Sequence, residues 1–453
     1  MSKKLTEKDF VTQMSGMNSI FGNFGGEVGQ ITLDNFRNAL NVNDEEVLNE
    51  LAFYIDVNKA SSLGSTSVDV GGNMHMRTLW ENAAVSILMD ENGNYCELNR
   101  NDCRYTTEGD YLLDSDGTIV SEFAHGDFMK IVPVTYGRVQ PVTVGATTIL
   151  RLWLSLVPLP GGYIIPQLVA GKFKSSLLSN KLRSLPGMVP ANSKTVHGFW
   201  ESAQLRSKNH GLANLDFRNY LLFHMMSKYA YRDCQNCKGQ DGTPVWGVGL
   251  DGTEGLASGE TTENNGFENQ RYVHTGETLS LGDYDGKVAV TLKNGNTGHS
   301  VNVAGFENPW GQYWEMIGGM ASVDLGVYCW RSNVVPASAP TAETFEGIEH
   351  VLLTRPTSSV WGMNIIASEN GQGVYMIPKQ SLAGVSYGDN YWYAAEGQLW
   401  LFGGDSSDGS YCGLASATSY HAWAYSNAFY SARLAYYGSL NKVSATQFKA
   451  LAV

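Results

Sequence analysis

Two short stretches of this chain carry residues whose types and spacing could do chemistry. Asp405 and Asp408 stand with two residues between them in a Ser- and Gly-rich stretch, and paired carboxylates are the acid and the nucleophile of many glycoside hydrolases. Such a stretch contains nothing that would raise one pKa or fix the distance between the carboxyl groups. We therefore predict that both side chains are solvated acids.

Cys234 and Cys237 have the Cys-x-x-Cys spacing of a zinc knuckle. The second half of a zinc site would have to come from Cys96 and Cys103, which lie in another part of the chain. Zinc stays an alternative, and free or locally packed thiols are the prediction. Six Cys in 453 residues are too few for a disulfide scaffold and fit a reducing compartment.

Two other groups of residues could be functional sites, but structural roles are the better interpretation of both. Asp114, Asp116 and Gly117 could suggest calcium, but they lack the spaced ligands and the closing Glu of a helix-loop-helix calcium site. A solvated hairpin turn is predicted there. His224 lies on the apolar face of a predicted helix, where a His is more often a hydrogen-bonded core residue than a ligand or a base.

Residues 405 to 427 have the composition of a binding surface. Six Ser, three Tyr, His421 and Trp423 supply hydroxyl groups and flat amphipathic rings, and Asp405 and Asp408 are the only formal charges. Antibody paratopes use such residues because Tyr and Trp give contact area at low entropic cost, while Ser adapts its hydrogen bonds. An ordinary exposed Ser and Gly loop is the alternative.

Two strands are predicted to hold this stretch at its ends. Residues 398 to 402 form a bulky apolar run that stops at Gly403 and Gly404, as a buried strand entering a turn would. Residues 428 to 436 alternate with a period of two, which is typical of a strand with one buried face. The stretch between them would then be displayed by a rigid support.

Composition bounds the fold class. A chain of 453 residues should contain two or three domains. It is 43% hydrophobic and 17% charged, with 50 Gly, 11 Trp, 23 Tyr and 17 Phe, which favours turn-rich β structure over helical bundles. The net charge is −13 and the sequence contains no basic patch, so we do not expect nucleic-acid binding. No uninterrupted apolar run predicts a membrane span, and no secretory signal is expected at the N-terminus.

The predicted fold is α+β, β-rich and multidomain. Residues 1 to 60 are predicted as a small helical head that attaches to a virion or oligomerises, with helices at 34 to 40 and 44 to 54. Residues 61 to 184 are predicted as a β-rich domain, with strands near 84 to 89, 128 to 136 and 148 to 156. Residues 185 to 453 are predicted as a ligand-binding domain whose one main helix, 216 to 230, is capped by Asp216 or Asn214.

Three stretches of the last domain together resemble a known family. They are residues 185 to 190 with the helix that runs into residues 231 to 236, residues 305 to 319, and residues 397 to 438 with Gly403-Gly404, Gly413-Leu414 and the closing 428 to 433. The resemblance is to variable proteins of diversity-generating retroelements, especially those of bacteriophage tails. It implies a C-terminal C-type lectin fold related to the formylglycine-generating enzyme fold, and it covers roughly residues 185 to 453.

The resemblance also implies which residues would face a ligand. Diversified adenine-containing codons in the family yield Ser, Asp, Tyr, His, Thr, Ala, Gly or Cys but not Lys, Glu, Gln, Met or Trp, and residues 405 to 427 contain none of these five except Trp423. The implied ligand-facing residues are Asp405, Ser406, Ser407, Asp408, Ser410, Tyr411, Ser416, Thr418, Ser419, Tyr420, His421, Tyr425 and Ser426. The implied scaffold residues of that face are Trp314, Trp400, Phe402, Phe429 and Leu434.

Two activities of related folds are not carried over. Sugar-binding C-type lectins hold calcium with Glu-Pro-Asn or Gln-Pro-Asp and with Trp-Asn-Asp, whereas this chain has Glu307-Asn308-Pro309 and no Trp-Asn-Asp. Formylglycine-generating oxidases hold copper with closely spaced C-terminal cysteines, whereas Cys329 and Cys412 stand far apart. We therefore expect no metal and no cofactor.

The expected function is that of a non-enzymatic receptor-binding protein at the tip of a phage tail fibre. It would be made in the host cytoplasm, join other virion tail proteins, and present a diversified face to a bacterial surface protein or glycan. A homotrimer is expected, since oligomerisation would add avidity. The alternatives are a cellular or pilus-tip adhesin with the same module and an enzyme, either an oxidase of the related fold or a glycan hydrolase.

Overall fold

The computed structural model describes residues 44–56, 67–144, 147–247, 249–250, 273–292, 297–361, 365–367, 374–378, 389–406 and 408–451. The chain divides into two units, Met1–Val47 and Leu48–Val453. Apart from α3 (Asp44–Leu51), which contains the division point, every described helix and strand belongs to the second unit. The helix predicted at 34 to 40 lies outside the described residues.

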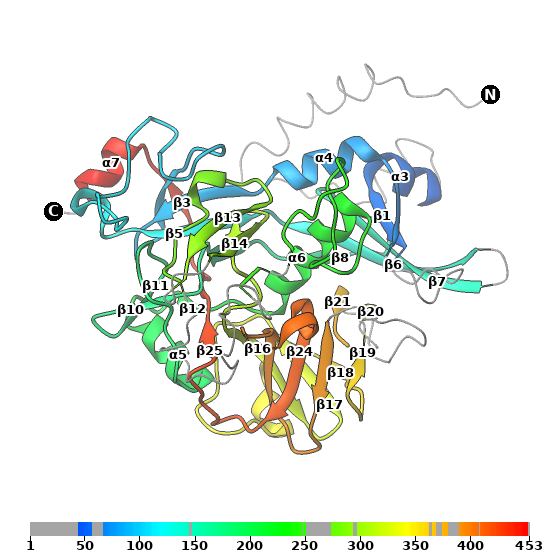
Figure 1. The fold of residues 1–453 in the computed structure, drawn as a ribbon. Coiled ribbons are helices and arrows are strands. Elements are labelled where there is room, and N and C mark those ends of the chain that lie inside the picture. Colours follow the sequence, from blue (N-terminus) through cyan, green and yellow to red (C-terminus); the bar gives the residue numbers. More distant parts are fainter. Residues whose placement is uncertain are drawn as a thin grey trace. The chain divides into compact units, whose positions relative to one another are not determined.

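An eight-stranded sheet dominates the C-terminal half (Figure 1). Its order is β18-β17-β16-β23-β24-β22-β19, and β25 pairs with β16. The strands are β16 (Trp314–Val323), β17 (Gly326–Trp330), β18 (His350–Thr354), β19 (Val360–Trp361), β22 (Asn390–Tyr393), β23 (Leu399–Gly403), β24 (Gly413–His421) and β25 (Tyr430–Ala432). The predicted strand at 398 to 402 is thereby confirmed as β23.

A seven-stranded sheet joins segments from both halves of the chain, in the order β12-β26-β9-β5-β3-β4-β27. Its strands are β3 (Val85–Met89), β4 (Asn94–Glu97), β5 (Asp127–Val132), β9 (Leu168–Gly171), β12 (His210–Leu212), β26 (Leu434–Tyr436) and β27 (Asn441–Lys442). Because β26 pairs with β9 and β27 pairs with β4, the boundary predicted between residues 184 and 185 does not separate two sheets.

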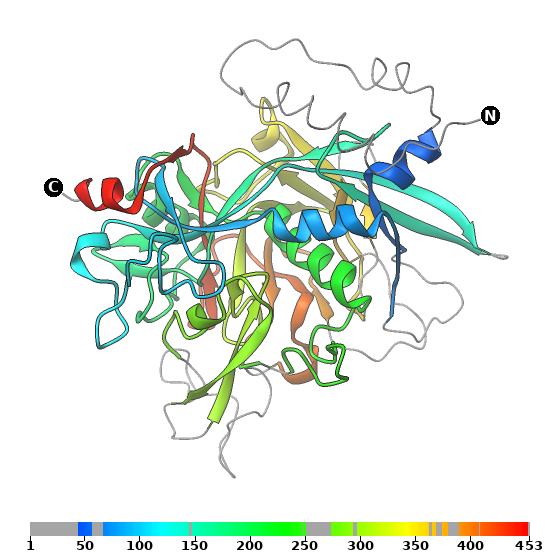
Figure 2. The same cartoon turned by 90° about the horizontal axis from the view of Figure 1, so that it is seen from above.

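A five-stranded sheet has the order β2-β1-β7-β6-β8. Its strands are β1 (Phe53–Asp56), β2 (Asp69–Gly72), β6 (Thr135–Val144), β7 (Thr147–Ser155) and β8 (Tyr163–Ile165). The far end of the β6–β7 hairpin, blue-green in Figure 2, pairs only with itself among the described strands. Smaller sheets are β10 (Ser176–Leu178) with β11 (Lys181–Arg183), β13 (Gly286–Thr291) with β14 (Thr297–Val303) and β15 (Phe306–Glu307), and β20 (Ile365–Ala367) with β21 (Val374–Met376).

One long helix lies between the sheets. α6 (Leu215–Tyr229) contacts β24 and β16 of the eight-stranded sheet and β1 and β9 of the other two. Nearly all its residues are buried, and the Asn214 side chain accepts a hydrogen bond from the Asp216 N–H at 3.1 Å. Asn214 is therefore the cap. The other α-helices that the structure describes in unit 2 are α4 (Met74–Asn82), α5 (Val196–Gln204) and α7 (Ala445–Ala450).

The predicted α+β, β-rich fold class is confirmed, with α6 as its main helix. The helix predicted at 44 to 54 ends at Leu51, and residues 53 to 56 form β1 instead. Among the described residues, none of the helices is long and apolar enough to cross a membrane.

Candidate functional site

The stretch predicted as a displayed loop contains a central strand. β24 pairs antiparallel with β23 and parallel with β22, so it has a neighbour on each side. Five of the predicted ligand-facing residues are buried: Asp405, Ser406, Ser416, Thr418 and Ser419. Their assignment to a ligand-facing surface is wrong in this structure, because neighbouring strands and packed layers cover them. Ser407 and the side chain of Ser410 lie outside the described part of the chain.

The other predicted residues do reach the surface. Tyr411, Tyr420 and Tyr425 are 41%, 56% and 38% exposed, Ser426 is exposed, and Asp408 and His421 are half-buried. Trp392 and Phe429 are among the half-buried aromatic residues of the hydrophobic cluster that contains Trp314. We call the following set the aromatic surface: Trp392, Asp408, Tyr411, Tyr420, His421, Tyr425 and Phe429.

Ring contacts connect one half of the aromatic surface around Trp314. The ring centroids of Trp314 and Trp392 are 5.4 Å apart, and those of Trp392 and Tyr411 are 6.2 Å apart, both edge to face. Edge-to-face contacts of this kind stabilise a fixed ring arrangement. The backbone N–H of Trp314 also donates to the Phe429 carbonyl oxygen at 2.9 Å, which connects this half to the segment before β25.

The other half is organised around His421. Its ring stacks on Tyr425 with centroids 4.2 Å apart, and its Nε2 lies 2.6 Å from the hydroxyl of Tyr430. Burial lowers the pKa of His421. Burial also raises the pKa of Tyr430, and the charges of Tyr425, Asp405 and Asp408 raise it further. The acids therefore lie within electrostatic range of this half as well.

Asp405 and Asp408 form an unusual acid pair rather than two solvated acids. The Asp405 N–H donates to Oδ2 of Asp408 at 2.8 Å. Burial raises the pKa of Asp408 to about 7, and the charge of Asp405 contributes to the rise, whereas hydrogen bonds from the Asp405 backbone and the Trp314 side chain oppose it. Asp408 therefore changes its protonation state near neutral pH. The prediction of ordinary solvated acids is wrong because the turn before β24 packs against Trp314.

Four of the five residues predicted as the scaffold of this surface are buried. Trp400, Phe402 and Leu434 are fully buried and Trp314 is 6% exposed, whereas Phe429 is only half-buried. The turn after β23 needs two glycines. A Cβ on Gly403 would lie 2.7 Å from the Pro309 carbonyl oxygen, one on Gly404 would lie 2.3 Å from Sγ of Cys412, and both residues have a positive φ.

Two successive residues of β24 give a test of this assignment. Ser419 is fully buried, and its Oγ lies 2.6 Å from the Tyr391 hydroxyl and 3.1 Å from Nη1 of Arg355. Ser419→Tyr would overpack this site and is expected to lower the free energy of unfolding by about 2–3 kcal/mol. Tyr420→Ser, at the exposed neighbour, is expected to change it by less than about 0.5 kcal/mol. Urea denaturation of both variants measures the difference, and equal effects would contradict the burial of Ser419.

The remaining sequence candidates are structural in the described residues. All six cysteines are buried and none of them forms a disulfide, and the Leu414 N–H donates to Sγ of Cys234 at 3.3 Å. His224 is buried with its Nε2 2.9 Å from Asp285, as predicted for a core His. The Gly117 N–H donates to the Asp114 carbonyl oxygen, so the predicted turn is confirmed. No group of three His, Cys, Asp or Glu is placed to hold a metal within the described ranges.

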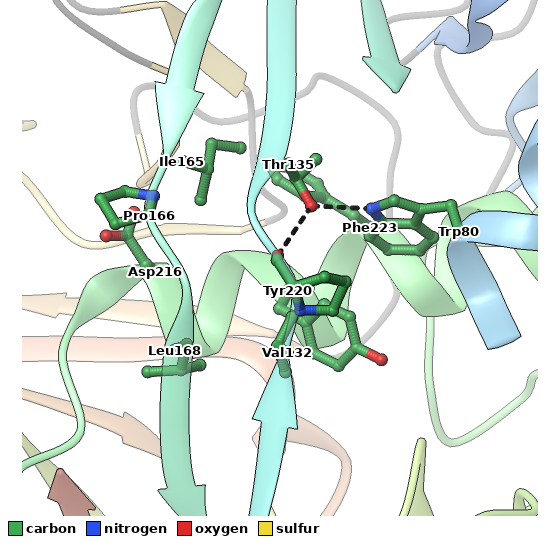
Figure 3. A pocket seen from close by; sticks show the side chains of 10 residues that line it. Trp80, Val132, Thr135, Ile165, Pro166, Leu168, Asp216, Tyr220 and Phe223 are labelled. Carbon is green, nitrogen blue, oxygen red and sulfur yellow. Dashed lines mark hydrogen bonds between the residues drawn. The ribbon is translucent and has the colours of Figure 1, made fainter. Parts of the chain in front are cut away.

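A small apolar cavity lies away from the aromatic surface, between α4, α6 and the segments that follow β5 and β8 (Figure 3). Trp80 Nε1 donates to Oγ1 of Thr135 at 2.9 Å, and Asp216 is held by Arg331 at 2.7 Å. These polar groups of its lining therefore already have protein partners, which leaves them less available to orient a ligand.

Sequence reasoning missed Trp392 and Tyr430 as parts of the site. Trp392 lies in the aromatic run Asn390-Tyr-Trp-Tyr, which was a usable signal, but nothing local indicated that β22 would pair with β24. The geometry offers hydroxyl, carboxylate and aromatic contacts on a rigid sheet, which suits reversible binding of a ligand. Neither a protein-family model nor a curated protein matches this chain.

Proposed function

We propose that this protein is a non-enzymatic receptor-binding protein of a phage tail fibre that presents the aromatic surface to a bacterial surface protein or glycan. The single observation that carries this proposal is the exposure of Tyr411, Tyr420 and Tyr425 around a buried, hydrogen-bonded strand. Interface energetics concentrate in aromatic anchors on well-packed supports. The phage context, the attachment to other tail proteins and the homotrimer rest on the family resemblance.

The arrangement also suits diversification. The exposed members of the predicted set can change without removing a core contact, because Trp400, Phe402 and Leu434 supply the buried support. Sequencing the DNA beside the gene tests this part. A reverse transcriptase and a near-copy of codons 400 to 436, with differences at adenines confined to exposed positions, are expected. A near-copy that varied the buried codons 416 and 419 would contradict the surface assignment.

Binding to bacteria tests the role directly. We expect a triple variant to adsorb to the host strain at least about tenfold more weakly than the parent protein, since exposed aromatic anchors dominate interface energy. The variant combines Tyr411→Ser, Tyr420→Ser and Tyr425→Ser. Its melting temperature should stay within about 2 °C of the parent. Adsorption across a panel of bacterial strains, followed by flow cytometry of labelled protein, provides the measurement.

A matched control uses three exposed tyrosines from elsewhere, Tyr105→Ser, Tyr111→Ser and Tyr284→Ser, which are 37%, 47% and 51% exposed. This variant changes the same number of rings and is expected to adsorb like the parent. Equal loss in both triple variants, or no loss in either, would refute a binding role for the aromatic surface.

A further inference from the structure

Among the described residues, none supplies a cationic partner to Asp408, the acid of the aromatic surface. No Lys or Arg occurs between Trp400 and Ala432. In the described structure, no Lys or Arg is among the groups that shift the pKa of Asp408. The carboxylate accepts hydrogen bonds from the Asp405 backbone and from Trp314, and its residue is half-buried. A half-buried carboxylate without a cation gains free energy when a ligand supplies one.

Exposed and half-buried aromatic rings lie near this residue. The Tyr411 N–H donates to the Asp408 carbonyl oxygen at 3.2 Å, and the ring of exposed Tyr411 contacts that of half-buried Trp392. The buried Tyr430 lies within electrostatic range of Asp408, and its ring centroid is 5.7 Å from that of the exposed Tyr425. The faces of Trp and Tyr rings attract ammonium and guanidinium groups. Rings and carboxylate together therefore provide both kinds of contact that an organic cation uses.

We propose that Asp408 and the aromatic surface bind the ammonium or guanidinium group of a Lys or Arg side chain on a receptor protein. This inference rests on the proposed receptor-binding function and names the partner class as protein rather than glycan. The carboxylate favours a cation that carries N–H donors, since only such a cation can hydrogen-bond to it. A quaternary ammonium group would contact the rings alone.

Binding of the cation should depend on pH. The pKa of Asp408 is raised to about 7, so its proton competes with the cation, and affinity is expected to fall as the pH drops from 8 to 6. The other titratable groups that face Asp408 are Asp405, which shares its turn, and Tyr430. His421 and Tyr425 contact Tyr430, and Tyr411, whose N–H donates to the Asp408 carbonyl oxygen, contacts Trp392. Burial lowers the pKa of His421, which keeps its ring neutral over most of this range.

The test titrates four small probes into the full-length protein. Binding of each probe is measured from shifts of the indole N–H signals of 15N-labelled tryptophan. n-Butylguanidinium and n-butylammonium are expected to bind, while the neutral isostere n-butylurea and the donor-free tetramethylammonium are expected to bind at least about tenfold more weakly. Equal binding of n-butylurea would overturn the role of charge. Equal binding of tetramethylammonium would overturn the assignment to Lys or Arg and favour a quaternary ammonium headgroup.

Asp408→Asn keeps the shape of the side chain and an oxygen that can accept from the Asp405 N–H, but it removes the charge. It is expected to weaken n-butylguanidinium binding at pH 8 by at least about tenfold and to abolish its pH dependence. Asp116→Asn is the matched control, since it makes the same charge change in an exposed turn. It should leave binding within about twofold of the parent. Unchanged binding in Asp408→Asn would overturn the proposal.

Cell adsorption separates the two proposals. If the tyrosine triple variant loses adsorption while Asp408→Asn keeps it, the proposed receptor-binding function is supported and the cation site is refuted. If the tyrosine triple variant adsorbs like the parent, the proposed receptor-binding function is refuted. The titrations with small probes then still decide whether the cation site exists.

Discussion

Glu315→Gln is expected to lower the free energy of unfolding by about 3–5 kcal/mol, the usual cost of breaking a buried ion pair by removing one partner. Glu315 and Arg433 are both fully buried, with Nε of Arg433 3.2 Å from the carboxylate. Burial raises the pKa of Glu315, but the charges of Arg433, Arg218 and Lys174 lower it by more, so the net shift is downward. The carboxylate is therefore ionised. Without this charge, a cluster of buried cations would lose its counter-ion.

The response of Lys174 strengthens this prediction. Burial lowers its pKa to about 7, and Glu315 is the group that opposes the shift most. In Glu315→Gln the pKa of Lys174 should fall further, so the variant is expected to lose more stability at pH 6 than at pH 8, where the ammonium group can release its proton.

Guanidinium denaturation at both pH values measures these changes. Glu97→Gln is the matched control, because Glu97 pairs with Lys442 at 2.6 Å on the surface, where the two side chains are 28% and 58% exposed. The control should have a much smaller effect, since solvent screens exposed pairs. Equal effects of the two substitutions would show that the buried network does not hold β16 to the segment between β25 and β26.

Trp400→Ala is expected to lower the free energy of unfolding by about 3–5 kcal/mol, because it deletes a large side chain from a closed core. Trp400 is fully buried, and its ring lies 5.5 Å from Tyr391 and 6.0 Å from Phe402, centroid to centroid. Its Nε1 donates to Oγ of Ser322 at 2.8 Å. The substitution therefore leaves both a cavity and a buried hydroxyl without its donor.

Phe429→Ala provides a graded comparison for Trp400→Ala. Phe429 is half-buried, so its truncation should cost clearly less than that of Trp400, although both were predicted as scaffold residues. Thermal unfolding followed by circular dichroism ranks the two variants. If Phe429→Ala were the more damaging of the two, the scaffold beneath the aromatic surface would have to be reassigned.

Local patterns predicted several elements correctly. α6 follows from an Asn cap and an apolar repeat, and β3, β5, β7 and β23 follow from short runs of apolar residues between turn signals. These signals depend on neighbours within a few positions, so they can be read without a tertiary structure. α5 was not predicted, although Thr195 caps it by accepting from the Gly198 N–H at 3.0 Å.

The two errors at the site share one physical cause. β24 was predicted as part of a displayed loop from its Ser- and Tyr-rich composition, yet its small Ala, Ser and Thr residues fit a strand that is covered on both faces. Residues 428 to 436 were predicted as one strand with a single buried face. They form β25 and β26, both faces are buried from Tyr430 to Tyr436, and Arg433 between them pairs with Glu315.

The sequence by itself determined the β-rich class, the main helix and the supply of Tyr, Ser and Asp near the C-terminus. Only the tertiary structure decided which of those residues face solvent, that Trp392 joins them, and that Asp408 is packed against Trp314. Exposure and pKa depend on atoms brought close by pairing between distant strands, as when β26 joins β9. Such contacts leave no pattern within a local stretch of sequence.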